Sequence, residues 1–162
     1  MKHITRIAAG FLLCSSFALA GGEGWMTNWE QAKAKAKAEN KPILIDFTGS
    51  DWCGWCIKLD KEVFAQKAFK EYAAKNLVLM EVDFPKKSKQ AADLKKQNKE
   101  LEKQYPLEGY PTVLLLDAEG KKLSEDIGYR EGGPEAYVKH LGELLEKAGA
   151  KKPAEPAAEK KP

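Results

Sequence analysis

The chain has 162 residues, a length that predicts one domain with room for a hydrophobic core. Its 27 Lys and Arg residues nearly balance its 24 Asp and Glu residues, for a formal net charge of +3. So small a charge excludes a mainly electrostatic role on nucleic acid or on an anionic membrane surface, and we expect no nucleic-acid partner.

Residues 1–20 have the three parts of a secretory signal peptide. Lys2 and Arg6 give a positive start, an uncharged apolar stretch follows, and the segment ends in Ala-Leu-Ala at 18–20. We therefore predict export, with cleavage after Ala20. Because cleavage removes two basic residues and no acidic one, the mature net charge is +1.

Two alternatives stay open at this end of the chain. An uncut membrane anchor would need a longer apolar run. A lipoprotein signal at Cys14 would usually have a small residue before the cysteine, where Leu13 stands. Export removes Cys14, so Cys53 and Cys56 remain as the thiols of a periplasmic or secreted protein, where a disulfide persists.

The first elements of the mature chain are a helix and a strand. After a short lead at 21–27, a helix is predicted over 27–40, because Thr27 and Glu30 have the spacing of a capping box. The apolar, β-branched run at 41–48 follows a proline and predicts a buried strand.

In the middle of the chain, the sequence pattern predicts further helices and a second strand. Helical patterns cover 56–64 and 66–76, with a break near 63–64. A second buried strand is predicted at 76–84. The segment 88–104 is a highly charged helix with a thin apolar stripe, so most of its surface should be solvated.

The last elements are predicted to be a hairpin and a closing helix. Residues 111–129 would form two strands joined by a turn at 118–121. A proline near the start and an apolar stripe indicate an amphipathic helix over 132–149.

Together these elements predict the domain organisation. Their order, α-β-α-β-α-β-β-α, indicates an α/β domain at 28–148 whose central mixed β-sheet is flanked by helices. The remaining 149–162 consist of Lys, Glu, Ala, Pro and one Gly. With so little apolar surface to bury, this segment is predicted to be a disordered, solvated tail.

The sequence Trp-Cys-Gly-Trp-Cys at 52–56 holds both remaining cysteines, and four kinds of site use such a pair. Structural zinc needs four ligands, and the mature chain adds only His140, so no metal is expected. Covalent haem needs histidine directly after the second cysteine, where Ile57 stands. A purely structural disulfide would close a very small loop and stabilise little. The fourth possibility is a redox-active pair that needs no other cofactor.

The position of the pair favours the redox hypothesis over the structural disulfide. It lies where the strand 41–48 is followed by a helix, and a helix N-terminus favours a thiolate. Cys53, at the helix start, is predicted to be the exposed nucleophile. Cys56, one turn further, would resolve a mixed disulfide by thiol–disulfide exchange.

Two stretches resemble the thioredoxin superfamily, in particular its secreted members. They are ILIDFTGSDWCGWCIKL at 43–59 and EGYPTVLLLDAEGK at 108–121. The resemblance spans about 28–148 and rests on Trp-Cys-x-x-Cys after a buried strand together with Gly-x-Pro-Thr before another. It implies a thioredoxin-like fold, with Cys53 matching the family's nucleophile and Cys56 its resolving thiol.

The resemblance also implies roles for Pro111 and Asp46. Pro111 matches the cis-proline that lies against the disulfide and holds the substrate strand, and Gly-Tyr-Pro-Thr is itself a suitable place for a cis bond. Asp46 matches the aspartate behind the resolving thiol, and is predicted to be the general base for Cys56. The alternative is an aspartate at the sheet edge that is hydrogen-bonded to backbone.

Three aromatic residues near the motifs are candidates for substrate binding. Trp55 is predicted to lie with Tyr110 on a docking surface, where exposed aromatic rings provide contact area. Trp52 is expected to contribute through a more buried position, and ordinary packing is the alternative for both tryptophans.

The sequence departs from the family pattern in three places. Gly-Trp separates the cysteines, where ordinary thioredoxins have Gly-Pro and disulfide isomerases Gly-His. The strand at 76–84 has no lysine, although thioredoxins place one there near the buried aspartate. The helix 88–104 is an insertion, and the seven lysines between 86 and 103 suggest either an acidic partner or, more simply, a solvated face.

The resemblance implies a secreted thiol–disulfide oxidoreductase that reduces protein disulfides. We expect a monomer that receives electrons from a membrane or other thiol donor, because no nicotinamide or flavin motif is present. Oxidase or isomerase action is the close alternative. A non-catalytic binding module with a structural disulfide is the alternative from another class.

Overall fold

The computed structural model describes residues 22–149. The predicted signal peptide at 1–20 and all but the first residue of the predicted tail at 149–162 lie outside this range. Among the described residues, no helix combines the length and the apolar character that a membrane span requires.

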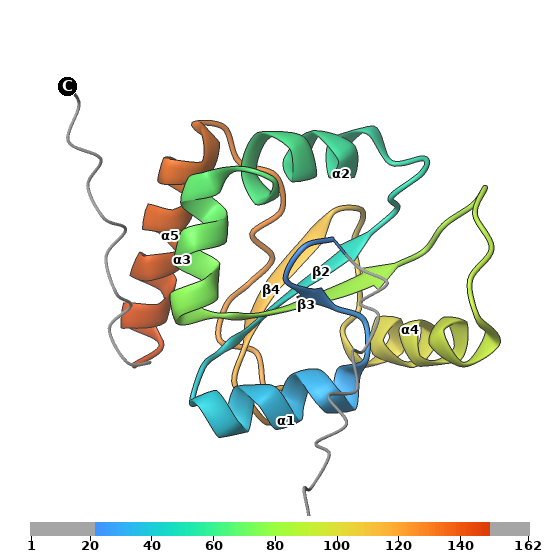
Figure 1. Cartoon of the computed structure of the whole chain (residues 1–162), viewed down its shortest axis with the longest axis horizontal. Helices are drawn as coiled ribbons and strands as arrows, with labels where there is room; N and C mark the ends of the chain where they lie inside the picture. Colours follow the sequence, from blue (N-terminus) through green and yellow to red (C-terminus); the bar gives the residue numbers. More distant parts are fainter. Residues whose placement is uncertain (1–21, 150–162) are drawn as a thin grey trace, which may run out of the picture.

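A four-stranded sheet forms the centre of the domain (Figure 1). Its strands are β1 (Trp25–Met26), β2 (Ile43–Thr48), β3 (Val78–Asp83) and β4 (Thr112–Leu116). They lie in the order β1-β3-β2-β4, with β4 antiparallel to β2 and the other pairs parallel. The predicted α/β class with a mixed sheet is therefore confirmed.

The interior position of β2 explains why four of its six residues are large and apolar. All six of its residues are buried, because β3 and β4 flank it and both of its faces are covered. Leu44 packs into the cluster on one face, while Ile43 and Ile45 pack into the cluster on the other. The continuous apolar run is the pattern expected of a strand buried on both sides.

Helices cover the two faces of the sheet (Figure 1). Helices α3 (Lys67–Asn76) and α5 (Gly133–Lys147) contact each other and pack on the face that carries Leu44. Helices α1 (Trp29–Glu39) and α4 (Ala92–Gln104) contribute buried residues to the opposite face. The apolar stripes of the sequence thus supply both halves of the core.

The start of α1 differs from the prediction by one residue. Asn28, and not Thr27, is the N-cap, and its side-chain oxygen accepts the N–H of Gln31 at 2.9 Å. The predicted capping box of Thr27 and Glu30 is therefore wrong, because asparagine fills the cap position equally well. Strand β1 was not predicted, since two residues carry no periodicity.

The helical region after the cysteines is confirmed with a change of geometry. Helix α2 (Gly54–Leu59) continues as a π-helical turn, η1 (Asp60–Phe64), before the chain enters α3. The helix breaks at 65–66, directly after this turn, so the break predicted near 63–64 comes one or two residues early. Leu59, the last residue of α2, is fully buried and anchors this helix to the core.

The predicted hairpin at 111–129 is only half correct. Its turn forms, with Gly120 at φ +91°, but the second strand is reduced to a single bridge between Leu116 and Lys122. Backbone and side chains share the pairing. The N–H groups of Leu123 and Ile127 donate to the carbonyls of Leu115 and Val113, both at 2.8 Å. In return, the N–H of Val113 donates to Asp126 at 2.8 Å and that of Leu115 to Ser124 Oγ at 3.0 Å. Together these bonds satisfy the edge of β4 without a regular partner strand.

Candidate active site

The two cysteines form a disulfide at the N-terminus of α2. Cys53 is the N-cap residue, and its Sγ accepts the backbone N–H of Cys56 at 3.2 Å. In this oxidised form both residues are buried, with 6% of Cys53 and 4% of Cys56 exposed. The prediction that Cys53 is the exposed cysteine is therefore wrong for the disulfide form.

A tight turn carries the chain from β2 to the disulfide. The carbonyl of Gly49 accepts the N–H groups of Trp52 at 3.2 Å and Cys53 at 2.9 Å. A Cβ atom at Gly49 would lie 2.5 Å from the indole of Trp52. Glycine is required here because the tryptophan ring packs directly over the backbone.

Asp51 ties this turn to the loop after β3. Its carboxylate accepts the backbone N–H groups of Lys86, Lys87 and Ser88 at 2.8–2.9 Å. These hydrogen bonds lower the pKa of Asp51 to about 2. A carboxylate next to the motif was visible in the sequence, but its partners lie 35 to 37 positions away and had no local signal.

Trp52 is half-buried and forms one wall of the site. Its indole N–H donates to the carbonyl of Phe84 at 2.8 Å, and Tyr110 meets the ring edge-on at 5.5 Å. The ammonium of Lys86 lies 3.5 Å from the centre of a Trp52 ring. The more buried position predicted for Trp52 is only partly correct, because one face of the ring is open to this lysine.

Trp55 lies on the surface and contacts an aromatic residue that the sequence did not indicate. It is 56% exposed and lies 5.3 Å from Tyr129, not beside Tyr110 as predicted. Lys58 sits 5.0 Å from Trp55 and 4.7 Å from Tyr129, and the Tyr129 hydroxyl donates to Glu62 at 2.6 Å. The hydrogen bond with Tyr129 raises the pKa of Lys58.

The predicted cis-proline is confirmed. The peptide bond between Tyr110 and Pro111 is cis and stands directly before β4. The Tyr110 hydroxyl donates to Glu102 of α4 at 3.0 Å, and burial together with this bond raises the pKa of Tyr110 to about 12. Helix α4, the insertion noted in the sequence, thereby supports one side of the site.

Asp46 is a buried carboxyl in the middle of the sheet. It is 7% exposed, it lies in an interior strand, and its Oδ1 has no hydrogen-bond partner within residues 22–149. The alternative of a sheet-edge aspartate bonded to backbone is therefore wrong. Burial, and secondarily the carboxylates of Glu81 and Asp60, raises the pKa of Asp46 well above its ordinary value.

A second carboxyl lies directly beside Asp46. In the parallel register of β2 and β3, Glu81 is the partner of Asp46. Burial, followed by repulsion from Asp83 and Asp60, raises the pKa of Glu81 to about 7. The lysine that thioredoxins place on this strand is absent, and the face carries a half-buried glutamic acid instead.

The described part of the chain forms no metal site. Among residues 22–149, no group of three or more His, Cys, Asp or Glu side chains is arranged to hold a metal ion. His140 lies on α5, where its Nδ1 is 3.9 Å from Glu143, and burial lowers its pKa.

Comparison with known proteins identifies the class of this fold and site. Residues 29–144 match the thioredoxin-like domain family. The disulfide bond reductase DsbH of Chlamydia pneumoniae is 37% identical over 140 residues, which is 86% of this chain and 84% of that protein. A solved structure of a DsbH oxidoreductase has a TM-score of 0.72 at 34% identity and covers 88% of this chain and 95% of that one.

A more distant relative is the thiol:disulfide interchange protein DsbD of Klebsiella pneumoniae. It is 34% identical over 96 residues, which are 59% of this chain but only 14% of that larger protein. The chain therefore belongs to the thioredoxin-like family. It is a thiol–disulfide oxidoreductase with a redox-active Cys-x-x-Cys pair, similar to a disulfide bond reductase, as the sequence motifs predicted.

We predict that Asp51→Ala lowers the thermal midpoint at pH 7, because three backbone N–H groups lose their acceptor. The pKa of Asp51 is lowered on folding, so its contribution is complete above the ordinary aspartate pKa near 4. It should decline as the pH falls from about 4 toward 2.

Thermal unfolding of wild type and variant between pH 7 and pH 2 measures this difference. Glu125→Ala is the matched control, since it removes an exposed carboxylate that accepts no hydrogen bond from residues 22–149. A difference between wild type and Asp51→Ala that stays constant down to pH 2 would show that the carboxylate does not act through its charge.

Proposed function

We propose that the protein, after export and signal-peptide cleavage, reduces disulfide bonds in protein substrates by dithiol exchange. The observation that carries the proposal is the contact of Cys53 Sγ with the N–H of Cys56 at the start of α2. The same N–H and the helix dipole would stabilise a thiolate on Cys53 in the reduced protein. A stabilised thiolate at this position is the attacking group that the reaction requires.

The reaction proceeds in two exchange steps. The Cys53 thiolate attacks one sulfur of the substrate disulfide, so that a mixed disulfide forms and the other substrate sulfur leaves as a thiolate that takes up a proton. Cys56 then loses its proton and attacks Cys53 Sγ, which releases the second substrate thiolate. Two electrons pass to the substrate, which ends as a dithiol, and the protein ends with its Cys53–Cys56 disulfide.

Asp46 is the proposed acceptor of the Cys56 proton. One oxygen of its buried carboxyl has no hydrogen-bond partner within residues 22–149, and burial raises its pKa, which makes the carboxylate a stronger base for the thiol proton. Glu81, its neighbour across the strands, is half-buried and has a pKa of about 7. This second carboxyl gives the proton a path from the interior toward solvent.

The oxidised pair needs two electrons before the next cycle. We propose that a second dithiol protein, anchored in the membrane, supplies them by the same exchange chemistry, and that the protein works as a monomer. Oxidation of substrates would run the same exchange in the opposite direction, and isomerisation would use the same groups with no net electron transfer. Either activity would require a higher reduction potential of the Cys53–Cys56 pair. A non-catalytic binding module would leave the pair permanently oxidised.

Detection of the mixed disulfide distinguishes an oxidoreductase from a non-catalytic binding module. We predict that Cys56→Ser accumulates a covalent complex with substrate through Cys53, because the resolving thiol is missing. Non-reducing electrophoresis of a periplasmic extract measures the complex, and Cys53→Ser is the control that should trap nothing. Failure of Cys56→Ser to trap any protein, with the fold intact, would favour the binding module.

A second prediction concerns the proton of Cys56. Asp46→Asn should slow resolution of a preformed mixed disulfide by about 100-fold at pH 7, because the internal base is lost. The rate should then rise with hydroxide concentration, a pH profile that a merely structural role would not change. Stopped-flow tryptophan fluorescence measures the step, and an unchanged rate and profile would remove Asp46 from the mechanism.

The same variant should be more stable than wild type at neutral pH. Since folding raises the pKa of Asp46, the folded state loses stability as the pH rises above the ordinary value near 4. Asp46→Asn should therefore raise the free energy of unfolding at pH 7 and change it little at pH 3, where the carboxyl is protonated in both states. Urea unfolding at the two pH values measures the gain, and an equal effect at both would contradict a buried, shifted carboxyl.

A further inference from the structure

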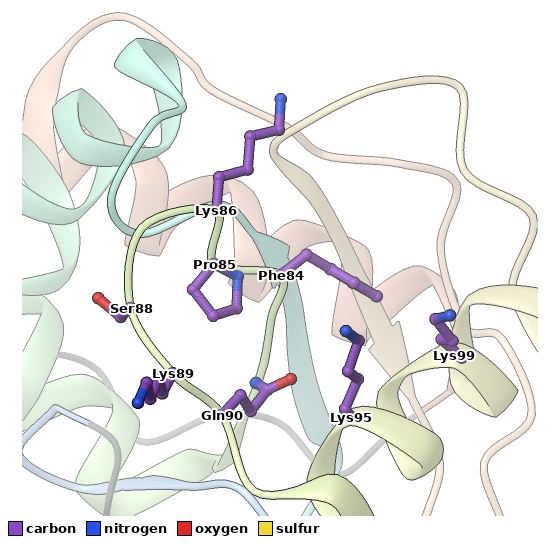
Figure 2. A pocket seen from close by; sticks show the side chains of 8 residues that line it. All are labelled: Phe84, Pro85, Lys86, Ser88, Lys89, Gln90, Lys95 and Lys99. Carbon is purple, nitrogen blue, oxygen red and sulfur yellow. The ribbon is translucent and has the colours of Figure 1, made fainter.

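A groove lies beside the active site, between the loop after β3 and helix α4 (Figure 2). Figure 2 shows that two elements supply its lysines, with Lys86 and Lys89 on the loop and Lys95 and Lys99 one turn apart on α4. The other residues that line it are Phe84, Pro85, Ser88 and Gln90. No carboxylate is among these lining residues.

The groove lysines are free of the ion pairs that lysines make elsewhere on the protein. Lys41 lies 2.7 Å from Glu39 and Lys70 lies 3.0 Å from Glu23. Within residues 22–149, by contrast, no carboxylate approaches within 4.0 Å of the ammonium group of any groove lysine. The groove therefore presents positive charge that the rest of the described chain does not neutralise.

One residue of the groove, Lys86, links it to the segment that carries the disulfide. Lys86 stacks over Trp52 at 3.5 Å, and Trp52 is bonded directly to Cys53. Asp51 fixes this arrangement, because its carboxylate holds the backbone of the loop against the active-site turn. A protein that brings its own disulfide to Cys53 would thus place the adjoining segment over the groove.

Carboxylates near the groove limit the length of an anionic segment that can bind in it. On one side, an adjoining hollow that shares Pro85 and Lys89 is lined by Glu81 and Asp83. On the other, Tyr110 packs on the Phe84 ring and donates to Glu102. A long polyanion or an extended anionic surface would meet these carboxylates, whereas a short acidic segment with some apolar side chains would fit between them.

We propose that this groove docks an acidic segment next to the reactive cysteines of the protein with which Cys53 and Cys56 exchange disulfides. The inference rests on the proposed function and adds the chemical class of its partner. Exposed ion pairs are individually weak, so the expected effect is on the rate of association, and it should weaken as salt screens the charges.

Two disulfide-bonded peptides, identical except that three glutamates flanking the disulfide in one are glutamines in the other, test the proposal. The measured quantity is the second-order rate constant with which each peptide oxidises the pre-reduced protein, followed by tryptophan fluorescence. At low ionic strength the acidic peptide should react about tenfold faster, and this preference should disappear in about 0.5 M salt.

The groove variant combines Lys89→Gln, Lys95→Gln and Lys99→Gln, and should react with the two peptides at nearly equal rates. Its control combines Lys75→Gln, Lys121→Gln and Lys122→Gln, exposed lysines at the opposite end of the strands that make no ion pair with residues 22–149. The control removes the same charge and should keep the full preference.

Each other outcome overturns a definite part of the account. Equal rates for both peptides with wild type, or loss of the preference in both triple variants, would overturn the groove as the docking site. Lysine-dependent binding to phosphatidylglycerol vesicles without peptide preference would replace the acidic segment by a membrane surface. If neither peptide oxidises the reduced protein, the proposed function itself would be overturned.

Discussion

The interaction on which the site depends is the anchoring of the active-site turn to the loop after β3. Asp51 accepts three backbone N–H groups from that loop, and Ser50 adds a second link by donating from both its N–H and its hydroxyl to Asp83. Because of these bonds, Trp52 is held against the Phe84 carbonyl and Lys86 is held over its ring. One carboxylate thus fixes both a wall of the disulfide site and the near side of the basic groove.

A second constraint comes from the buried carboxyl of Asp46, which opposes stability and is our proposed base for Cys56. An ionised carboxylate in an interior strand with an unsatisfied oxygen destabilises the fold. The apolar cluster on the face that carries Leu44 includes Leu59 of α2 and Tyr137 of α5, and its burial offsets this cost. Glu81 takes the position beside it, so this site has two neighbouring carboxyls where thioredoxins have a carboxyl and an amine.

Local sequence was sufficient for the features that depend on short motifs. The apolar runs predicted β2 and β3, the spacing predicted the Cys53–Cys56 pair, and Gly-Tyr-Pro-Thr predicted the cis bond before Pro111. The features that depend on distant partners had no such signal. Tyr129 beside Trp55 is one, and the pairing through backbone and side chains that replaces the second strand of the hairpin is another. In both cases contacts between residues that are distant in the sequence determine the structure, and local periodicity does not predict such contacts.

If the Cys53–Cys56 pair donates electrons to substrate disulfides, as we propose, its reduction potential must be low. The measurement equilibrates the mature protein in glutathione or dithiothreitol buffers and traps the free thiols by alkylation. We expect a value near or below about −250 mV, close to that of thioredoxin. A value between about −180 and −120 mV, typical of disulfide isomerases and oxidants, would contradict it.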